Sequence, residues 1–136
     1  MPAQNKTFPW MAYYGHYNYF EKQMNNHNNI TRWEMTPEGL YKVHRNHQDI
    51  LNVFICECYI YGVAEYTKTI DEIGPIDCIV INSMWCSFTN EVKRICRNKG
   101  VLLCKITDFM GAMNFEEYSA YLSIDEKKKW EEKGWI

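Results

Sequence analysis

Apolar and polar positions along the chain follow two different periods, which predicts a mixture of helices and strands. Residues 50–61 (ILNVFICECYIY) are apolar on both faces, as expected for a central strand of a sheet. Residues 89–99 (TNEVKRICRNK) instead repeat their apolar side chains with the period of a helix. The predicted elements are a helix at 16–27, strands at 30–35, 40–45 and 50–61, a helix at 64–73, a strand at 76–83, a helix at 89–99, a strand at 101–106 and a largely helical tail at 109–135.

The residues between these elements predict how the strands pair. Pro37 and Gly39 hold the second and fourth positions of one expected type I turn, and residues 46–49 form another turn. Thr89 is placed to cap the start of a helix, and Gly100 to end it. Short turns force the first three strands to be antiparallel, whereas the later strands alternate with helices and are expected to add in parallel.

These connections predict one α/β domain, with a mixed β-sheet and helices on both faces. A length of 136 residues suits a single domain, and 46% apolar residues supply material for its core. The predicted single domain, 1–136, is divided into an irregular aromatic-rich segment at 1–15, a core at 16–110 and a helical tail at 111–136.

Charge and hydropathy narrow the classes of partner. The formal net charge is −2, so no global basic field draws the protein to nucleic acid or to a membrane surface, and any polyanion binding must be local. Apolar runs stay shorter than the ~18–20 residues that a membrane span requires. We therefore expect no membrane association.

The six cysteines are expected to be reduced. Most of them lie inside apolar runs such as FICECYI and IDCIVI, where cysteine acts as a small hydrophobic residue. The first residues lack the charged start and apolar stretch of a signal peptide, which favours a cytoplasmic protein. A structural zinc site is the alternative, but Cys56 and Cys58 have C-x-C rather than C-x₂₋₄-C spacing.

Glu57 is the only carboxylate in the predicted central strand. A buried carboxylate is costly unless it is paired, protonated or bound to a metal ion. If residue 45 faces residue 50 across the turn, Glu57 lies opposite Glu38. Two carboxylates at this distance recruit a cation, and Mg²⁺ or Mn²⁺ is the expected ion. A strand carboxylate bonded to a tyrosine or a backbone amide is the simpler interpretation of Glu57, and a solvated turn residue that of Glu38.

The order of these residues resembles the PD-(D/E)xK superfamily of restriction-endonuclease-like nucleases, which includes Holliday-junction resolvases and Mrr-type enzymes. Glu21 matches the acid of the family's first helix, Pro37-Glu38 its Pro-Asp pair, and Glu57-Cys58-Tyr59 its (Asp/Glu)-x-Lys motif. The resemblance covers roughly residues 16–110. It implies an αβββαβ core with an added αβα, and Mg²⁺-dependent phosphodiester hydrolysis. By the same resemblance, Glu38 and Glu57 bind the metal and Glu21 assists.

The sequence departs from that family at Tyr59, which replaces the lysine. A phenol cannot supply the fixed positive charge that stabilises a developing anion. Lys68 on the next helix is a candidate substitute, and Glu91 with Lys93 is a second match to the motif, although their segment has a helical period. The alternative to a nuclease is a non-catalytic binding module, or a protein inhibitor of phage or plasmid type, that keeps the fold.

Two further surfaces are candidates for partners. One helix has a basic face that is expected either to contact nucleic acid, with DNA favoured, or to be a solvated surface. The aromatic N-terminal segment either docks a protein partner or covers a sheet edge. A homodimer is also compatible with the sequence. The candidate phosphate-contacting residues are Lys93, Arg94, Arg97 and Lys99.

Overall fold

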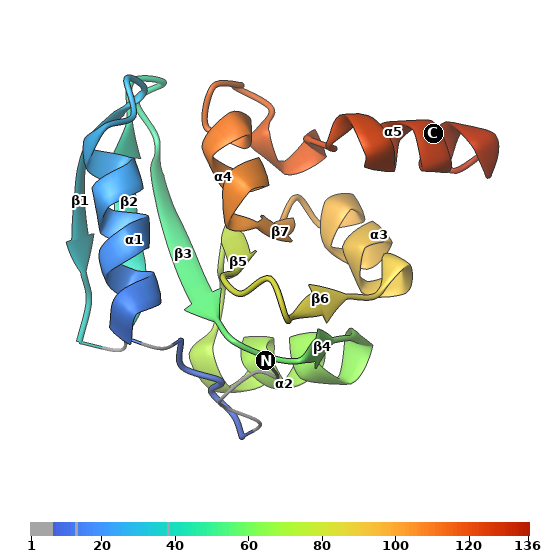
Figure 1. Cartoon of the computed structure of the whole chain (residues 1–136), viewed down its shortest axis with the longest axis horizontal. Coiled ribbons are helices and arrows are strands. Elements are labelled where there is room, and N and C mark those ends of the chain that lie inside the picture. Colours follow the sequence, from blue (N-terminus) through green and yellow to red (C-terminus); the bar gives the residue numbers. More distant parts are fainter. Residues whose placement is uncertain (1–6, 13, 38) are drawn as a thin grey trace.

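The computed structural model describes residues 7–12, 14–37 and 39–136 (Figure 1). In these residues the chain forms a five-stranded mixed sheet, a two-stranded sheet beside it and five α-helices. The predicted α/β class is therefore confirmed. The elements are α1 (Tyr14–Asn25), β1 (Ile30–Met35), β2 (Tyr41–Arg45), β3 (Ile50–Cys56), β4 (Ile60–Tyr61), α2 (Val63–Ile73), β5 (Cys78–Ile81), β6 (Ser87–Phe88), α3 (Asn90–Asn98), β7 (Leu102–Lys105), α4 (Ile106–Ala112), a 3₁₀ turn (Tyr118–Ala120) and α5 (Ile124–Glu132).

The main sheet has the strand order β1-β2-β3-β5-β7, and its first three strands are antiparallel, as predicted. The register between β2 and β3 differs from the prediction by one residue, because His44 rather than Arg45 faces Ile50. Gln48 adopts a left-handed backbone with φ 65°, and its N–H donates to the Arg45 carbonyl at 3.0 Å. The hairpin is therefore closed by a three-residue loop instead of the expected four-residue turn.

The predicted strand at 50–61 is wrong in its second half. β3 ends at Cys56, and β4 belongs to the separate two-stranded sheet, where it pairs with β6 in parallel. The N-terminal segment pairs with the chain at this break. Met11 forms an antiparallel bridge with Cys56, and the Glu57 N–H donates to the Trp10 carbonyl at 2.7 Å. Glu57 therefore lies just beyond the central strand, not within it.

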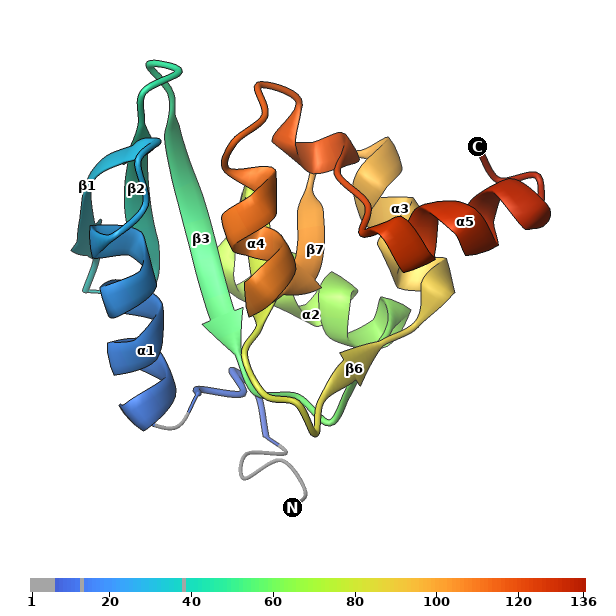
Figure 2. The same cartoon turned by 45° about the horizontal axis from the view of Figure 1, so that its top comes forward.

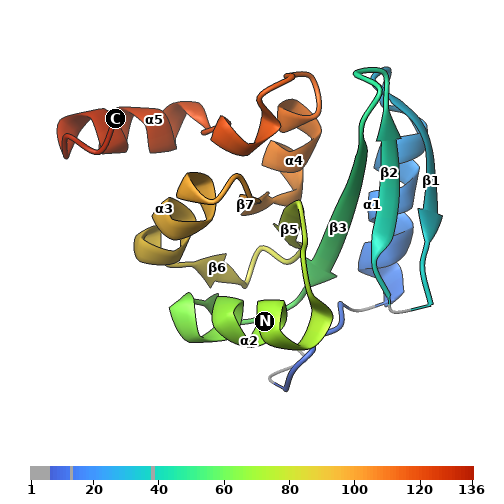
Figure 3. The same cartoon turned by 180° about the vertical axis from the view of Figure 1, so that it is seen from behind.

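Side chains that alternate along the parallel strands β3, β5 and β7 feed two cores, one on each face of the sheet. Val53 and Ile55 pack with α1 and α4, whereas Phe54 and Cys56 pack with α2 and α3. Figure 2 shows α1 and α4 in front of the strands, and Figure 3 gives the view from behind. Helices on both faces are thus confirmed.

The local signals at helix ends behave as predicted. The Thr89 side chain accepts a hydrogen bond from the Val92 N–H at 3.2 Å, and Gly100, with φ 75°, follows the end of α3. The tail is less helical than expected, because α4, the 3₁₀ turn and α5 are separated by short irregular connections. No helix in the described part of the chain is long and apolar enough to cross a membrane.

Candidate functional site

Glu57 occupies the carboxyl end of β3 and is only 3% exposed. Its Oε1 atom lies 4.0 Å from Nδ1 of His16, a residue of α1. Its Oε2 atom is buried and has no hydrogen-bond partner in the described residues. Buried carboxylate oxygens are normally satisfied, so this oxygen requires an explanation.

Tyr17 connects Glu57 to the rest of α1. Its hydroxyl accepts a hydrogen bond from the Ala12 N–H at 3.1 Å. Burial raises the pKa of Tyr17; the Ala12 hydrogen bond opposes this, and the charges of Cys56 and Glu57 add to the rise. The Glu57 carboxylate therefore acts electrostatically on Tyr17 of α1, and its Oε1 lies 4.0 Å from His16 of the same helix.

Glu21 lies on the same helix and contacts β2. The Tyr41 hydroxyl donates to Glu21 Oε2 at 2.6 Å. Burial raises the pKa of Tyr41 far above its ordinary value, and the hydrogen bond to Glu21 raises it further. The Glu21 carboxylate is therefore held against Tyr41, the first residue of β2. The Tyr17 ring centre lies 6.3 Å from that of Tyr41.

Among the described residues, no hydrogen bond or ion pair joins Glu57 to Glu21, Tyr59 or Lys68, the other residues that the family resemblance suggested. Glu38 lies outside the described residues, and the observed register removes the argument that it faces Glu57, because the β2–β3 ladder ends at Tyr41 and Val53. Tyr59 is half exposed and follows the end of β3, so it does not share a strand with Glu57. Lys68 Nζ lies 5.4 Å from the Phe8 ring centre.

The alternative match to the family motif is wrong. Glu91 and Lys93 both lie in α3, so they cannot share one face of a strand. Lys93 is also only 1% exposed, and its ammonium donates to the Leu103 carbonyl. It is therefore unavailable to a phosphate, contrary to the predicted basic face.

The rest of that basic face is covered in part by the C-terminal segment. The Arg94 guanidinium lies 4.3 Å from the Trp135 ring centre, and Arg97 lies 5.7 Å from Trp130. Lys99 is exposed. These cation–π contacts pack the C-terminal segment against α3, so both arginines are partly occupied by aromatic rings.

Polar residues at the ends of β5 and β7 complete the edge at which Glu57 lies. Asn82 follows β5, is 6% exposed, and its Nδ2 atom has no acceptor in the described residues. Its backbone N–H donates to the Cys56 carbonyl at 3.2 Å, which places it beside Glu57. Lys105 ends β7. Ligands of open α/β sheets bind at this carboxyl edge of parallel strands.

The pKa of Cys86 depends on the charged groups at this edge. Burial raises the pKa of the Cys86 thiol; the Ser83 hydrogen bond lowers it, the Glu57 charge raises it and the Lys105 charge lowers it. All six cysteines are free and buried, as small apolar residues would be. A raised thiol pKa makes Cys86 a poor nucleophile.

A metal ion has one candidate ligand here. Within residues 7–12, 14–37 and 39–136 there is no group of three His, Cys, Asp or Glu side chains that could hold a metal ion. The Oε2 of Glu57 is a carboxylate oxygen, the ligand type that Mg²⁺ takes from proteins, but it is buried, so an ion with a water shell could bind it only if the surrounding side chains moved.

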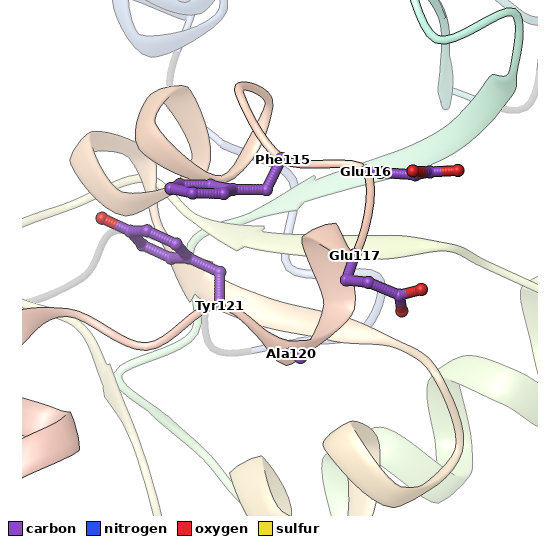
Figure 4. Close-up of a pocket in the computed structure, with 5 residues that line it drawn as sticks. All are labelled: Phe115, Glu116, Glu117, Ala120 and Tyr121. Atoms are coloured by element: carbon purple, nitrogen blue, oxygen red, sulfur yellow. The ribbon is translucent and has the colours of Figure 1, made fainter.

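A cavity lies near the opposite end of the sheet from Glu57. At this end the Arg45 side chain donates hydrogen bonds to carbonyl groups of residues 113–116. Figure 4 shows the Phe115 and Tyr121 rings side by side, with Glu116 and Glu117 pointing away from them. The two carboxylates do not converge on a ligand position. We therefore place the candidate site at the carboxyl edge and not here.

A local sequence pattern does point to Asn82 as a residue of the polar edge. The four apolar residues of β5 are followed at once by Asn82 and Ser83, which is how a buried parallel strand reaches a polar edge. His16 and Lys105 have no comparable local signal, because only the packing of α1 and β7 brings them near that edge. Comparisons with family models, with curated proteins and with solved structures found no match.

Proposed function

We propose that this chain is a nucleic-acid-acting domain with a restriction-endonuclease-like core, and that it hydrolyses phosphodiester bonds of DNA with a divalent ion, Mg²⁺ or Mn²⁺, at Glu57. The observation on which the proposal depends is the Glu57 carboxylate, buried at the end of a central strand with one oxygen unpartnered. A protein retains such a group at a cost, and functional sites are where that cost is usual.

The element order supports the same proposal. A helix, three antiparallel strands, a second helix and a strand parallel to the third follow one another in the order α1-β1-β2-β3-α2-β5, with the short β4 inserted. This is the αβββαβ order that the family resemblance implies. Glu21 lies on α1, the corresponding helix, whereas Glu57 directly follows the end of β3.

The roles follow from the chemistry of the side chains. Glu57 is the proposed metal ligand, and Glu21, fixed by Tyr41, is the proposed assisting acid. His16 lies 4.0 Å from Glu57 and is partly exposed, so it is placed to contact a phosphate bound at this edge. A bound Mg²⁺ would polarise the phosphate and lower the pKa of a coordinated water.

A cleavage assay tests this proposal. Purified protein is incubated with duplex, branched and single-stranded DNA and with RNA, with Mg²⁺, with Mn²⁺ and with chelator. We expect metal-dependent cutting that falls at least ~100-fold in Glu57→Gln, the magnitude typical of losing a group that stabilises the transition state. Glu72→Gln, an exposed glutamate of α2, is the matched control and is expected to cut normally. Equal cutting by both variants, or none by the wild type, contradicts the proposal.

A non-catalytic binding module is the second candidate function. It is favoured by a group of exposed apolar side chains around β4 and the β5–β6 connection, which are Tyr59, Ile60, Met84 and Trp85. The Ser87 N–H donates to the Tyr59 carbonyl at 3.0 Å, so the two segments are adjacent. Exposed aromatic and methionine side chains are enriched at protein interfaces. Uncut nucleic acids with no binding, in the same assay, would favour a protein partner.

A further inference from the structure

A cavity of about 180 Å³ opens where the main sheet divides at its carboxyl edge. Ile81 and Lys105 are the last paired residues of β5 and β7. Beyond them one segment runs toward β6, and the other turns directly into α4. The cavity lies between these two diverging segments and is lined by residues 81–84 and 105–107. Glu57, which follows the end of β3, is not among the residues that line it.

Four of the residues that line the cavity carry polar side chains, in a lining that is otherwise apolar. Lys105 supplies an ammonium group, Ser83 and Thr107 supply hydroxyls, and Asn82 supplies an amide. The Asn82 side chain is more than nine-tenths buried, and its Nδ2 atom has no acceptor among the described residues. The Ser83 Oγ accepts from the Trp85 N–H at 3.2 Å, and the Ser83 side chain is also hydrogen-bonded to Cys86.

The charge of Lys105 is not neutralised by a direct partner. Across the described part of the chain, none of the ion pairs within 4.0 Å and none of the hydrogen bonds involves its ammonium. Asp108 is the nearest acid in sequence. Burial raises the pKa of Asp108, and so does Glu126, while Lys93 and Lys105 oppose the rise. Lys105 and Asp108 therefore interact electrostatically, and burial outweighs this interaction in the pKa of Asp108.

One cation with neutral donors around it is the composition of an oxyanion site, since charged donors bind phosphate most strongly. The volume also suits a phosphate. Water takes up about 30 Å³ in the liquid, so the cavity has room for a phosphate group and one ester substituent, but not for a nucleobase as well. A carboxylate ligand would leave part of this donor set unused.

We propose that Lys105, Asn82, Ser83 and Thr107 form a phosphate-binding subsite. This inference rests on the proposed function, because it assigns to the same edge a second phosphate position next to the one at Glu57. The backbone hydrogen bond from Asn82 to Cys56 ties the subsite to the end of β3. A nucleic acid backbone would then contact both positions, and Lys105 would orient the strand for cleavage at Glu57.

Titration with inorganic phosphate, followed by amide NMR spectra near pH 7, tests the subsite without any cleavage. We expect saturable shifts in the amides of residues 82–84 and 105–107. Lys105→Gln is expected to weaken phosphate binding at least ~10-fold, which corresponds to losing about 1.4 kcal/mol. Lys105→Arg retains the charge and is expected to restore most of the affinity.

Lys42→Gln is the matched control, because this lysine is exposed on β2, which β3 separates from β5 and β7. Its phosphate affinity should stay within twofold of the wild type. Shifts spread over exposed lysines, or equal affinities for Lys105→Gln and Lys42→Gln, overturn the subsite. Unfolding curves of each variant show whether the fold is retained, and Lys105→Arg keeps the test valid if Lys105→Gln unfolds.

A DNA oligonucleotide, added to Glu57→Gln in the presence of chelator, separates the two proposals. If phosphate binds through Lys105 but the wild type cuts no nucleic acid, the subsite stands and the proposed function fails. If DNA is cut in a Glu57-dependent manner and Lys105→Gln binds phosphate normally, the subsite fails and the proposed function stands. Weaker oligonucleotide binding by Lys105→Gln than by Lys42→Gln supports both.

Discussion

Replacing Arg45 with alanine should weaken the contacts between the main sheet and the segment at residues 113–118. Arg45 ends β2 and its side chain is fully buried. Its guanidinium donates to both carboxylate oxygens of Asp49, at 2.9 and 2.5 Å, and to the carbonyls of Phe115 at 2.7 Å and Met113 at 3.3 Å. The Tyr118 ring centre lies 5.0 Å from the same group.

The expected loss follows from which partners can return to water. Removing one member of a buried ion pair costs about 3–5 kcal/mol when the other charge stays buried. The Asp49 side chain is 35% exposed, so it can be solvated again and its share of that cost is smaller. The Met113 carbonyl remains buried without its donor, at about 1–3 kcal/mol. We expect Arg45→Ala to lower the free energy of unfolding by about 2–4 kcal/mol.

Urea unfolding and thermal melting measure this loss, and a melting temperature lower by roughly 10 °C is the corresponding shift. Arg32→Ala is the matched control, because Arg32 lies on the adjacent strand with its side chain 65% exposed, 3.6 Å from Glu34. It should cost less than about 1 kcal/mol. Amide exchange should quicken at residues 113–121 only in Arg45→Ala. Equal stabilities of the two variants would refute this account of Arg45.

Three smaller effects should also be measurable. The Arg45 hydrogen bonds lower the pKa of Asp49, so its stabilising contribution is present above its ordinary value of 3.8 and is lost as the pH falls through the lowered folded-state pKa; the stability gap to Asp49→Asn should close in urea titrations below pH 4. Thr89→Ala should cost about 1 kcal/mol through the lost cap of α3, and a loss under about 0.3 kcal/mol would argue against it. Lys93→Ala should cost about 2–3 kcal/mol through the orphaned Leu103 carbonyl, whereas Lys99→Ala should be nearly neutral; comparable losses would contradict the burial of Lys93.

The sequence by itself determined the order and type of the main elements. The apolar period separated α3 from β7, and Thr89 and Gly100 marked the ends of α3 because caps and left-handed positions are local properties of the backbone. Short turns likewise predicted the antiparallel start of the sheet. Each of these inferences depends on residues that are neighbours in the chain, and neighbours are visible in a sequence.

Only the tertiary structure decided the register, the end of β3 and the surroundings of Glu57. A three-residue loop shifted the pairing by one position, and the segment around Trp10 ended the strand from a distance of more than forty residues in the chain. The burial of Lys93, two residues from exposed Glu91, depends on the β7 carbonyl that accepts its hydrogen bond. A local pattern cannot report which distant group meets a side chain, and the cost of burying a charge is decided by that group.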